Sequence, residues 1–186
     1  MNVGFALCGS FCTYAQVFPI MELLSRDYSL TPIFSQVSYT TDSRFGTAAE
    51  HIETVRELCG REPLHTIAQV EPIGPKKLFD ILVIAPCTGN TLAKLAHGIA
   101  DGPVTMAAKS HLRNGRPVLI AVSTNDALGA AAENIGRLMA RKHYYFVPFS
   151  QDDAFGKPTS MVADFTKIPQ ALEAALEGKQ IQPVVF

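Results

Sequence analysis

Several features that define common binding sites are missing from this chain. It has no tryptophan, no Gly-x-Gly-x-x-Gly motif and no pair of Cys-x-x-Cys motifs. A chain of this length needs no disulfide framework, so we interpret its four cysteines as reduced thiols of a cytosolic protein. The five histidines are scattered without the spacing of zinc ligands, which predicts no metal site.

Charge of one sign and long apolar runs are also scarce. The formal net charge is −1, so no basic field exists to hold nucleic acid or an anionic membrane. No apolar run reaches the roughly 20 residues of a membrane span. The first residues are apolar but lack the positively charged start of a signal peptide, so they predict a first strand. With 47% hydrophobic and 18% charged residues, the composition is typical of one globular domain over residues 1–186.

The stretch Ile81–Thr91 carries the clearest local signal. Its first five residues, Ile81–Ala85, are apolar and indicate a strand buried on both faces. Small polar residues follow Pro86, and a helical pattern covers residues 92–101. Open α/β sheets bind ligands beyond the carboxyl ends of their strands, and the first turn of a helix attracts a phosphate or carboxylate. The same pattern also fits a loop whose hydroxyl groups only cap the helix.

Strand and helix patterns alternate along the whole chain. Strands are predicted at Asn2–Leu7, Leu30–Val37, His65–Val70, Ile81–Ala85, Arg116–Val122 and Tyr144–Pro148. Further helices are predicted at Tyr14–Ser25, Thr47–Cys59, Val104–Leu112, Ala130–Lys142 and Ile168–Leu176. The segments Tyr39–Gly46 and Phe149–Lys157 are polar and predict loops. This order indicates a single α/β domain, a Rossmann-like doubly wound parallel sheet flanked by helices.

Three turns follow predicted strands and share one composition. Gly9–Thr13, Pro86–Thr91 and Ser123–Gly129 are rich in hydroxyl and amide side chains. Such groups suit the binding of a polar cofactor better than unaided proton transfer. Without the Gly-x-Gly-x-x-Gly motif, the chain lacks the usual binding site for the pyrophosphate of a dinucleotide, but a ligand with one phosphate remains possible. Thiol catalysis by Cys12 or Cys87 would need a neighbouring base or cation, which the sequence does not identify.

The residues Pro86–Asp101 resemble the Pro-Ala-Ser/Thr-Ala-Asn-Thr…Gly-Ile-Ala-Asp motif of the flavoprotein family of homo-oligomeric, flavin-containing cysteine decarboxylases. Gly9 and Ser10 are similar to the glycine-serine turn after that family's first strand, and Asn125 to the asparagine of its Pro-x-Met-Asn motif. The resemblance implies FMN as cofactor and a homo-oligomer, a trimer or a multiple of it. It implies that the flavin contacts Gly9, Ser10, Phe11, Cys12, Ser35, Pro86, Cys87, Thr88, Asn90, Thr91, Ser123, Thr124 and Asn125.

Two departures from that family pattern concern catalysis. Pro72 stands where the decarboxylases have a catalytic histidine, and Val122–Asn125 replaces Pro-x-Met-Asn. Without the imidazole, a general base for thiol decarboxylation is absent. No side chain is therefore assigned a catalytic role.

Most of the chain resembles one branch of the family. The similar segments are Glu71–Leu78, Ala85–Lys94, Pro103–Lys109, His111–Asn114, Ser123–Asp126, Tyr145–Phe149 and Gln151–Asp153. Members of this branch are the flavoprotein (B) subunits of a two-subunit oxidoreductase that makes an aromatic pyridine dicarboxylate in the mother cell of sporulating bacteria. The resemblance implies an A subunit with a nicotinamide-type Rossmann domain as partner and a small dicarboxylate as substrate.

The substrate's two carboxylates need cations to hold them. From charge alone we take Arg44, Lys76, Lys77 and Arg113 as candidate partners. Two other readings stay open: an FMN-dependent cysteine decarboxylase, and a non-catalytic subunit that only stabilises the A subunit.

Overall fold

A seven-stranded sheet forms the centre of the computed structural model, which describes residues 1–186. The parallel part has the order β2-β1-β3-β4-β5, with bounds β1 (Asn2–Leu7), β2 (Ser29–Phe34), β3 (Ile81–Cys87), β4 (Val118–Thr124) and β5 (Tyr144–Phe146). Two short strands, β6 (Phe149–Ser150) and β7 (Met161–Ala163), run antiparallel to each other. The predicted single-domain, Rossmann-like α/β fold is confirmed.

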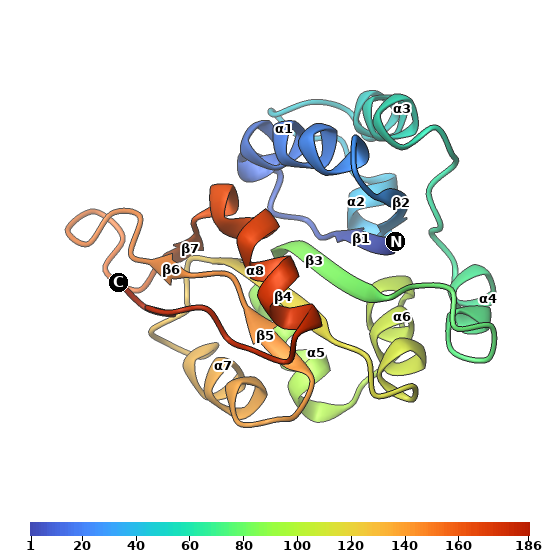
Figure 1. Ribbon diagram of the computed structural model, residues 1–186. Helices are drawn as coiled ribbons and strands as arrows, with labels where there is room; N and C mark the ends of the chain where they lie inside the picture. Colours follow the sequence, from blue (N-terminus) through green and yellow to red (C-terminus); the bar gives the residue numbers. More distant parts are fainter.

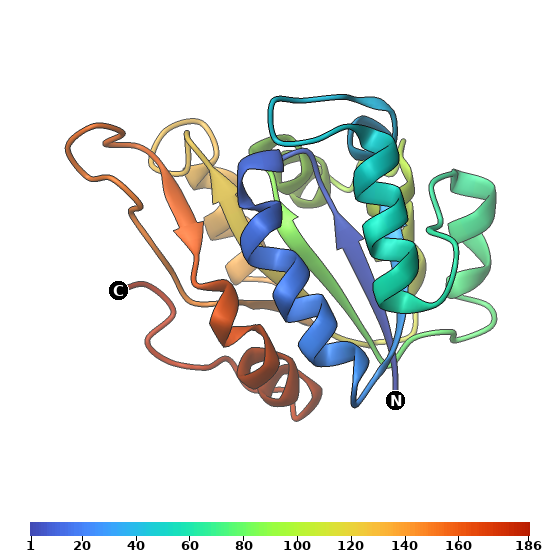
Figure 2. The same cartoon turned by 90° about the horizontal axis from the view of Figure 1, so that it is seen from above.

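Helices cover both faces of the sheet (Figures 1 and 2). One face carries α1 (Tyr14–Ser25), α3 (Ala48–Cys59) and α8 (Ile168–Leu176), and the other carries α5 (Gly89–His97), α6 (Pro103–Leu112) and α7 (Ala132–Met139). The short helices are η1 (Phe11–Thr13), α2 (Gln36–Thr40), α4 (Ile67–Val70), η2 (Glu71–Ile73) and η3 (Phe165–Lys167). None of the helices has the length and hydrophobicity that a membrane span requires.

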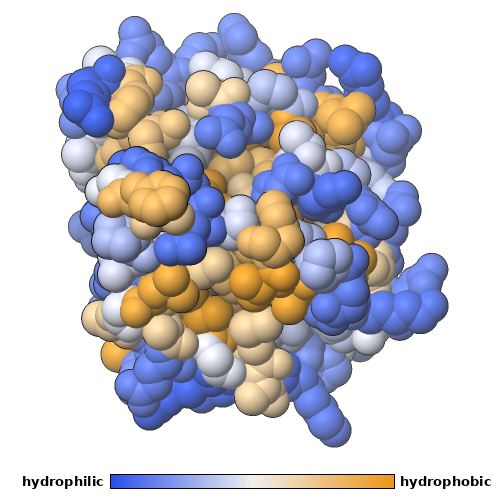
Figure 3. Space-filling model, turned by 90° about the vertical axis from the view of Figure 1, so that its left-hand side faces the viewer, coloured by the Kyte–Doolittle hydropathy of each residue, from blue (hydrophilic) through white to orange (hydrophobic).

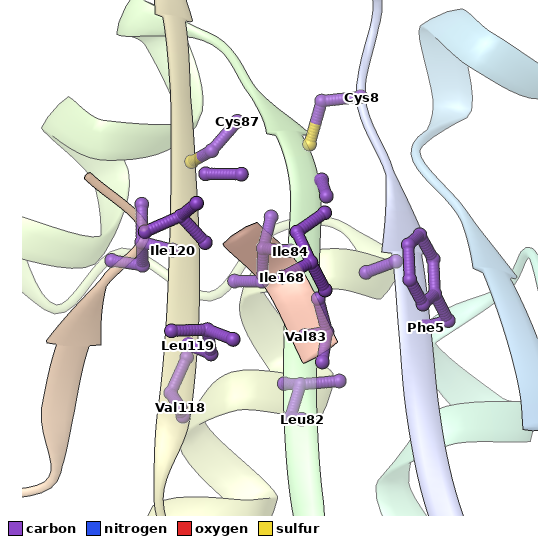
Figure 4. Close-up of a cluster of buried hydrophobic side chains, with 14 of the residues drawn as sticks. Phe5, Cys8, Leu82, Val83, Ile84, Cys87, Val118, Leu119, Ile120 and Ile168 are labelled. Atoms are coloured by element: carbon purple, nitrogen blue, oxygen red, sulfur yellow. The ribbon is translucent and has the colours of Figure 1, made fainter. Parts of the chain in front are cut away.

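The central strands β3 and β4 lie in the middle of the core. Every residue of β3 is buried, and β4 is buried as far as Ser123. Figure 4 shows their side chains packed together with Ile168 of α8. Strands covered on both faces have no solvent side, so their sequences are continuously apolar and do not alternate.

Two strands, β5 and β7, pair with the same edge of β4. Its first half pairs in parallel with β5, whereas Ser123 and Thr124 at its end pair antiparallel with β7. The segment between β6 and β7 therefore returns to the carboxyl end of the sheet, where the Thr159 hydroxyl donates to the Asn125 carbonyl oxygen at 2.7 Å. Figure 2 shows this loop and the loop at residues 41–47 along the same edge of the molecule.

Strand β2 is shorter than predicted. It ends at Phe34, and the next residues form α2 because the Ser35 hydroxyl accepts from the Ser38 backbone N–H at 3.1 Å and so caps a helix. The prediction of a strand to Val37 and of a loop from Tyr39 was wrong at this boundary, and the loop begins at Thr41.

The predicted strand at His65–Val70 was also wrong, because this segment contains the helix α4. The Thr66 hydroxyl accepts from the Gln69 backbone N–H at 3.3 Å, and the Gln69 side-chain oxygen accepts from the Thr66 N–H at 3.0 Å. This capping box stabilises one helical turn where the apolar content alone suggested a strand. Elsewhere the boundaries of β1, α1 and α8 were predicted to the residue, whereas the helix expected at Ala130–Lys142 is shorter at both ends.

A buried histidine on α6 should make stability depend on pH. His111 is 1% exposed, its Nε2 donates to the Pro117 carbonyl oxygen at 3.0 Å, and burial lowers its pKa to about 4. In the unfolded chain this histidine has its ordinary pKa of about 6.5. The stability of the folded protein, in which the histidine stays neutral, is therefore unaffected by this group above that pH. It decreases as the pH falls from 6.5 towards the folded-state pKa of about 4, because the unfolded chain then binds a proton that the folded protein does not. We expect the free energy of unfolding to fall by about 2 kcal/mol between pH 7 and pH 5 on this account.

The variant His111→Gln keeps a donor for the Pro117 oxygen but does not titrate. Denaturant unfolding at pH 7 and pH 5 should show a smaller pH-dependence in this variant than in the unmodified protein. His97→Gln, at an exposed position, is the matched control and should behave like the unmodified protein. Equal pH-dependence in all three proteins would contradict the assignment.

Candidate functional site

The three polar turns singled out in the sequence lie side by side. They follow β1, β3 and β4, which are neighbours in the sheet, at the carboxyl ends of these strands. The hydroxyl oxygens of Ser10 and Ser123 are 2.8 Å apart, so the two outer turns meet across the end of the middle strand. The structure therefore makes one site from three separate segments, as expected for an open α/β sheet.

The N-terminus of α5 forms the middle of this site. Thr88 is the N-cap: its hydroxyl accepts from the Thr91 N–H at 3.4 Å, and its carbonyl oxygen accepts from the Leu92 N–H at 2.9 Å. Gly89 and Asn90 occupy the first turn, where backbone N–H groups have no partner within the helix. Together with the helix dipole, these groups favour an anionic ligand such as a phosphate.

Two cavities open at this edge. The larger, about 940 Å³, is lined by Gly9, Ser10, Phe11, Cys12, Ser43, Arg44, Phe45, Thr88, Gly89, Asn90, Ser123, Thr124, Asn125, Asp126, Asp152, Lys157, Thr159, Ser160 and Val162. The smaller, about 370 Å³, is lined by Cys8, Gly9, Ser35, Gln36, Val37, Thr88, Asn90, Thr91, Lys94, Asp101, Gly102, Pro103, Val104 and Thr105. Gly9, Thr88 and Asn90 line both, so the cavities meet at the N-terminus of α5.

Most of the residues expected to contact a cofactor line these cavities. Nine line the larger one: Gly9, Ser10, Phe11, Cys12, Thr88, Asn90, Ser123, Thr124 and Asn125. Ser35 and Thr91 line the smaller one. Pro86 and Cys87 line neither, because both are buried at the end of β3 (Figure 4 shows the Cys87 thiol among core side chains).

The four candidate substrate cations are not brought together. Arg44 lines the larger cavity. Lys76 and Lys77 precede β3 and Arg113 follows α6, so these three lie towards the amino ends of the strands and line neither cavity. Arg113 instead lines a separate depression beside α5 and α6.

Arg44 is also the cation of the larger cavity that has no carboxylate partner. Lys157 lies 3.3 Å from a carboxylate oxygen of Asp152, whereas the Arg44 guanidinium lies 4.8 Å from the centre of the Phe45 ring and forms no ion pair. The positive charge of Arg44 is thus available to a ligand in the cavity.

The thiols and histidines do not form a nucleophilic pair here. Burial raises the pKa of Cys8 to about 11 and that of Cys87 well above its ordinary value, so both thiols stay neutral. No histidine lines either cavity, and Pro72 lies in η2, outside both of them. The site can hold a polar, phosphate-bearing group but offers no imidazole as a general base.

Comparison with known sequences identifies the family. The model of the family described as "Flavoprotein" matches residues 1–168. The chain belongs to the flavoprotein family.

Individual relatives agree with this assignment. This flavoprotein is 47% identical, over 99% of its length and 92% of the relative's, to the B subunit of dipicolinate synthase from Bacillus subtilis. Its structure is similar to the crystal structure of the corresponding B subunit from Bacillus halodurans, with a TM-score of 0.91 and 46% identity over 100% of this chain and 95% of that one. It also shares its fold with DmrB of Burkholderia xenovorans, solved in complex with FMN, at a TM-score of 0.69 and 17% identity over 95% of each chain.

The residues of this flavoprotein fit a flavin mononucleotide. A side chain at Gly89 would place its Cβ 2.8 Å from the Thr124 hydroxyl and 2.9 Å from a carboxylate oxygen of Asp126, so the glycine keeps the space between α5 and the turn after β4 open. Hydroxyl and amide groups surround that space, and the helix terminus suits a single phosphate.

Sequence reasoning missed several lining residues. Phe45, Asp126 and the segment 152–162 of the β6–β7 connection all contribute to the larger cavity. The sequence predicted a polar loop at Phe149–Lys157 and no element at residues 158–162. The return of the chain to β4 depends on an antiparallel pairing of β7 with only two residue pairs, for which the sequence has no distinct pattern.

Proposed function

We propose that this flavoprotein binds FMN and acts as the B subunit of a dipicolinate synthase. In this role it would oxidise a dihydrodipicolinate-type precursor to dipicolinate (pyridine-2,6-dicarboxylate), in the cytoplasm of the mother cell during sporulation. The observation that carries the proposal is a large cavity, lined mainly by uncharged polar groups, that also contains one unpaired cation, Arg44. The identity of 47% to the B subunit of a known dipicolinate synthase supports the choice of reaction.

The proposed reaction divides the work between a cofactor and the chain. Formation of the aromatic ring removes two electrons and two protons from the dihydropyridine, and a bound flavin would supply the electron acceptor that no side chain provides. The Thr88 cap and the first turn of α5 would bind the cofactor phosphate. Arg44 would hold a substrate carboxylate by a charge-assisted hydrogen bond and so orient the ring in the larger cavity.

Two partnerships belong to the proposal. The B-subunit relative implies a second, A subunit, which we propose carries a nicotinamide-type Rossmann domain. We also propose that the chain forms a homo-oligomer, a trimer or a multiple of it, which the description of the DmrB structure as a cubic protein cage supports.

An absorbance spectrum of the purified protein tests the cofactor, and an assay with and without the A subunit tests the reaction. We expect flavin bands at roughly 370 and 450 nm and dipicolinate formation only when both subunits are present. Release of CO₂ from a peptidyl-cysteine or pantothenoyl-cysteine substrate would instead show a decarboxylase. A colourless protein that fails to bind added FMN but still activates the A subunit would show a non-catalytic stabilising subunit.

A further inference from the structure

One aromatic side chain of this protein has almost no contact with the rest of the chain. Phe155 is 99% exposed, whereas the next most exposed large hydrophobic residue, Phe186, is 61% exposed. Phe155 belongs to the segment Gln151–Lys157, called here the acidic loop. The connection between β6 and β7, which contains this loop, projects from the side of the molecule (Figure 1). Figure 3 shows that side, where hydrophobic residues are exposed between hydrophilic ones.

The acidic loop has an ordered internal structure. A carboxylate oxygen of Asp153 accepts from the Gly156 N–H at 2.7 Å, and its carbonyl oxygen accepts from the Lys157 N–H at 2.8 Å. Asp152 forms an ion pair with Lys157 at 3.3 Å. These contacts hold the loop in one shape with Phe155 outward, so a partner that covers the ring would lose little entropy in ordering it.

A complementary surface exists elsewhere on the same chain. The depression beside α5 and α6, called here the basic depression, has a volume of about 420 Å³ and is lined by Leu95, Gly98, Ile99, Ala100, Thr105, Lys109, Leu112, Arg113, Arg141 and Tyr144. Apolar side chains alternate with three cations, and no acidic residue lines it. Ile99 within it is 47% exposed, and Lys109 and Arg113 form no ion pair.

The acidic loop and the basic depression cannot meet within one molecule. The loop lies at the carboxyl ends of the strands, because Asp152 and Lys157 line the larger cavity there and Thr159, two residues after the loop, donates to the Asn125 carbonyl oxygen in the turn after β4. The depression includes Arg113, which precedes β4, and Tyr144, the first residue of β5, so it lies towards the amino ends. Contact between them is therefore possible only between two copies.

We propose that the acidic loop of one copy docks in the basic depression of a second copy, with Phe155 inserted between the apolar side chains. Aromatic anchors that fill a pocket supply most of the binding energy in many interfaces. The loop has two aspartates and one lysine, a net charge of −1, and the three cations of the depression favour this orientation over a contact between like charges. Such a contact joins different surfaces of the two molecules, so repeated contacts form a ring when the rotation between successive copies closes and an open chain when it does not. Because Asp152 and Lys157 of the loop also line the larger cavity, assembly would hold one wall of that cavity in place.

Two variants that each damage one half of the contact provide the test. Phe155→Ser removes the anchor, and Ile99→Asp places a charge in the depression without touching either cavity at the sheet edge. Loss of a central aromatic anchor weakens association by about 30-fold or more, so each variant alone should sediment as a smaller species than the unmodified protein. Leu23→Ser, on α1 and 45% exposed, is the matched control and should leave the mass unchanged.

Mixing the two variants distinguishes the loss of this contact from the unfolding of a variant and from docking of the loop on another protein. Each mixed pair retains one intact loop and one intact depression, so a heterodimer should form in the mixture although neither variant associates alone. Circular dichroism and melting curves of each variant confirm that it is folded. A mixture that stays monomeric, or a Phe155→Ser variant with unchanged mass, overturns the proposal. Loss of binding to the A subunit with unchanged self-association also overturns it, since the loop would then dock on the partner.

Discussion

Replacing Gly89 by valine should weaken FMN binding by about 100-fold or more, which corresponds to about 2.8 kcal/mol. Gly89 is the first residue of α5 and lines the larger cavity. A Cβ atom there would lie 2.8 Å from the Thr124 hydroxyl and 2.9 Å from Asp126, so a branched side chain must displace both groups and enter the space proposed for the cofactor. Titration of the apoprotein with FMN, followed by quenching of flavin fluorescence, measures the change.

Gly136→Val is the matched control for this prediction. Gly136 lies in α7, outside both cavities, and a Cβ atom there would meet no side chain and no other element within 4 Å. The substitution therefore introduces the same side chain into a helix without crowding. Equal FMN affinity of the two variants would show that the first turn of α5 does not hold the cofactor.

Replacing Arg44 by alanine should raise the KM for the dicarboxylate substrate by about 10- to 100-fold, because a hydrogen bond to a charged group contributes about 1.5–3 kcal/mol. The structure holds this arginine over the larger cavity on a tight turn, in which backbone bonds of 3.0 and 3.2 Å join Ser43 and Gly46. The His51 Nε2 donates to the Phe45 carbonyl oxygen at 3.2 Å and ties the turn to α3. Steady-state kinetics with the A subunit present measures the effect.

Arg44→Lys and Lys76→Ala complete that experiment. Lysine keeps the charge but not the two-pronged geometry of the guanidinium, so Arg44→Lys should fall between the unmodified protein and Arg44→Ala. Lys76 lies outside both cavities, and Lys76→Ala should leave KM unchanged. A raised KM in Lys76→Ala together with an unaltered KM in Arg44→Ala would place the substrate elsewhere.

The central fold was predictable because its signals are local. The apolar run Ile81–Ala85 and the periodic pattern of Tyr14–Ser25 depend on burial within single elements, and both were found at those places. Two of the elements that were missed, α2 and α4, are short helices that begin at a hydroxyl cap, which in α4 is part of a capping box. Such caps compete with apolar content that also suits a strand, and the sequence pattern alone does not decide between them.

The amino-acid sequence by itself determined the order of the main strands and helices, the polar turns that end β1, β3 and β4, and the fit of the Pro86–Asp101 segment to the flavoprotein family. Only the tertiary structure decided which charges share the site with those turns. It placed Arg44 over the cavity and left Lys76, Lys77 and Arg113 outside it, and it brought the acidic loop to the end of β4. Local patterns report the neighbours of a residue along the chain, whereas the distance between charges on separate loops depends on how the sheet twists and how its edges pair.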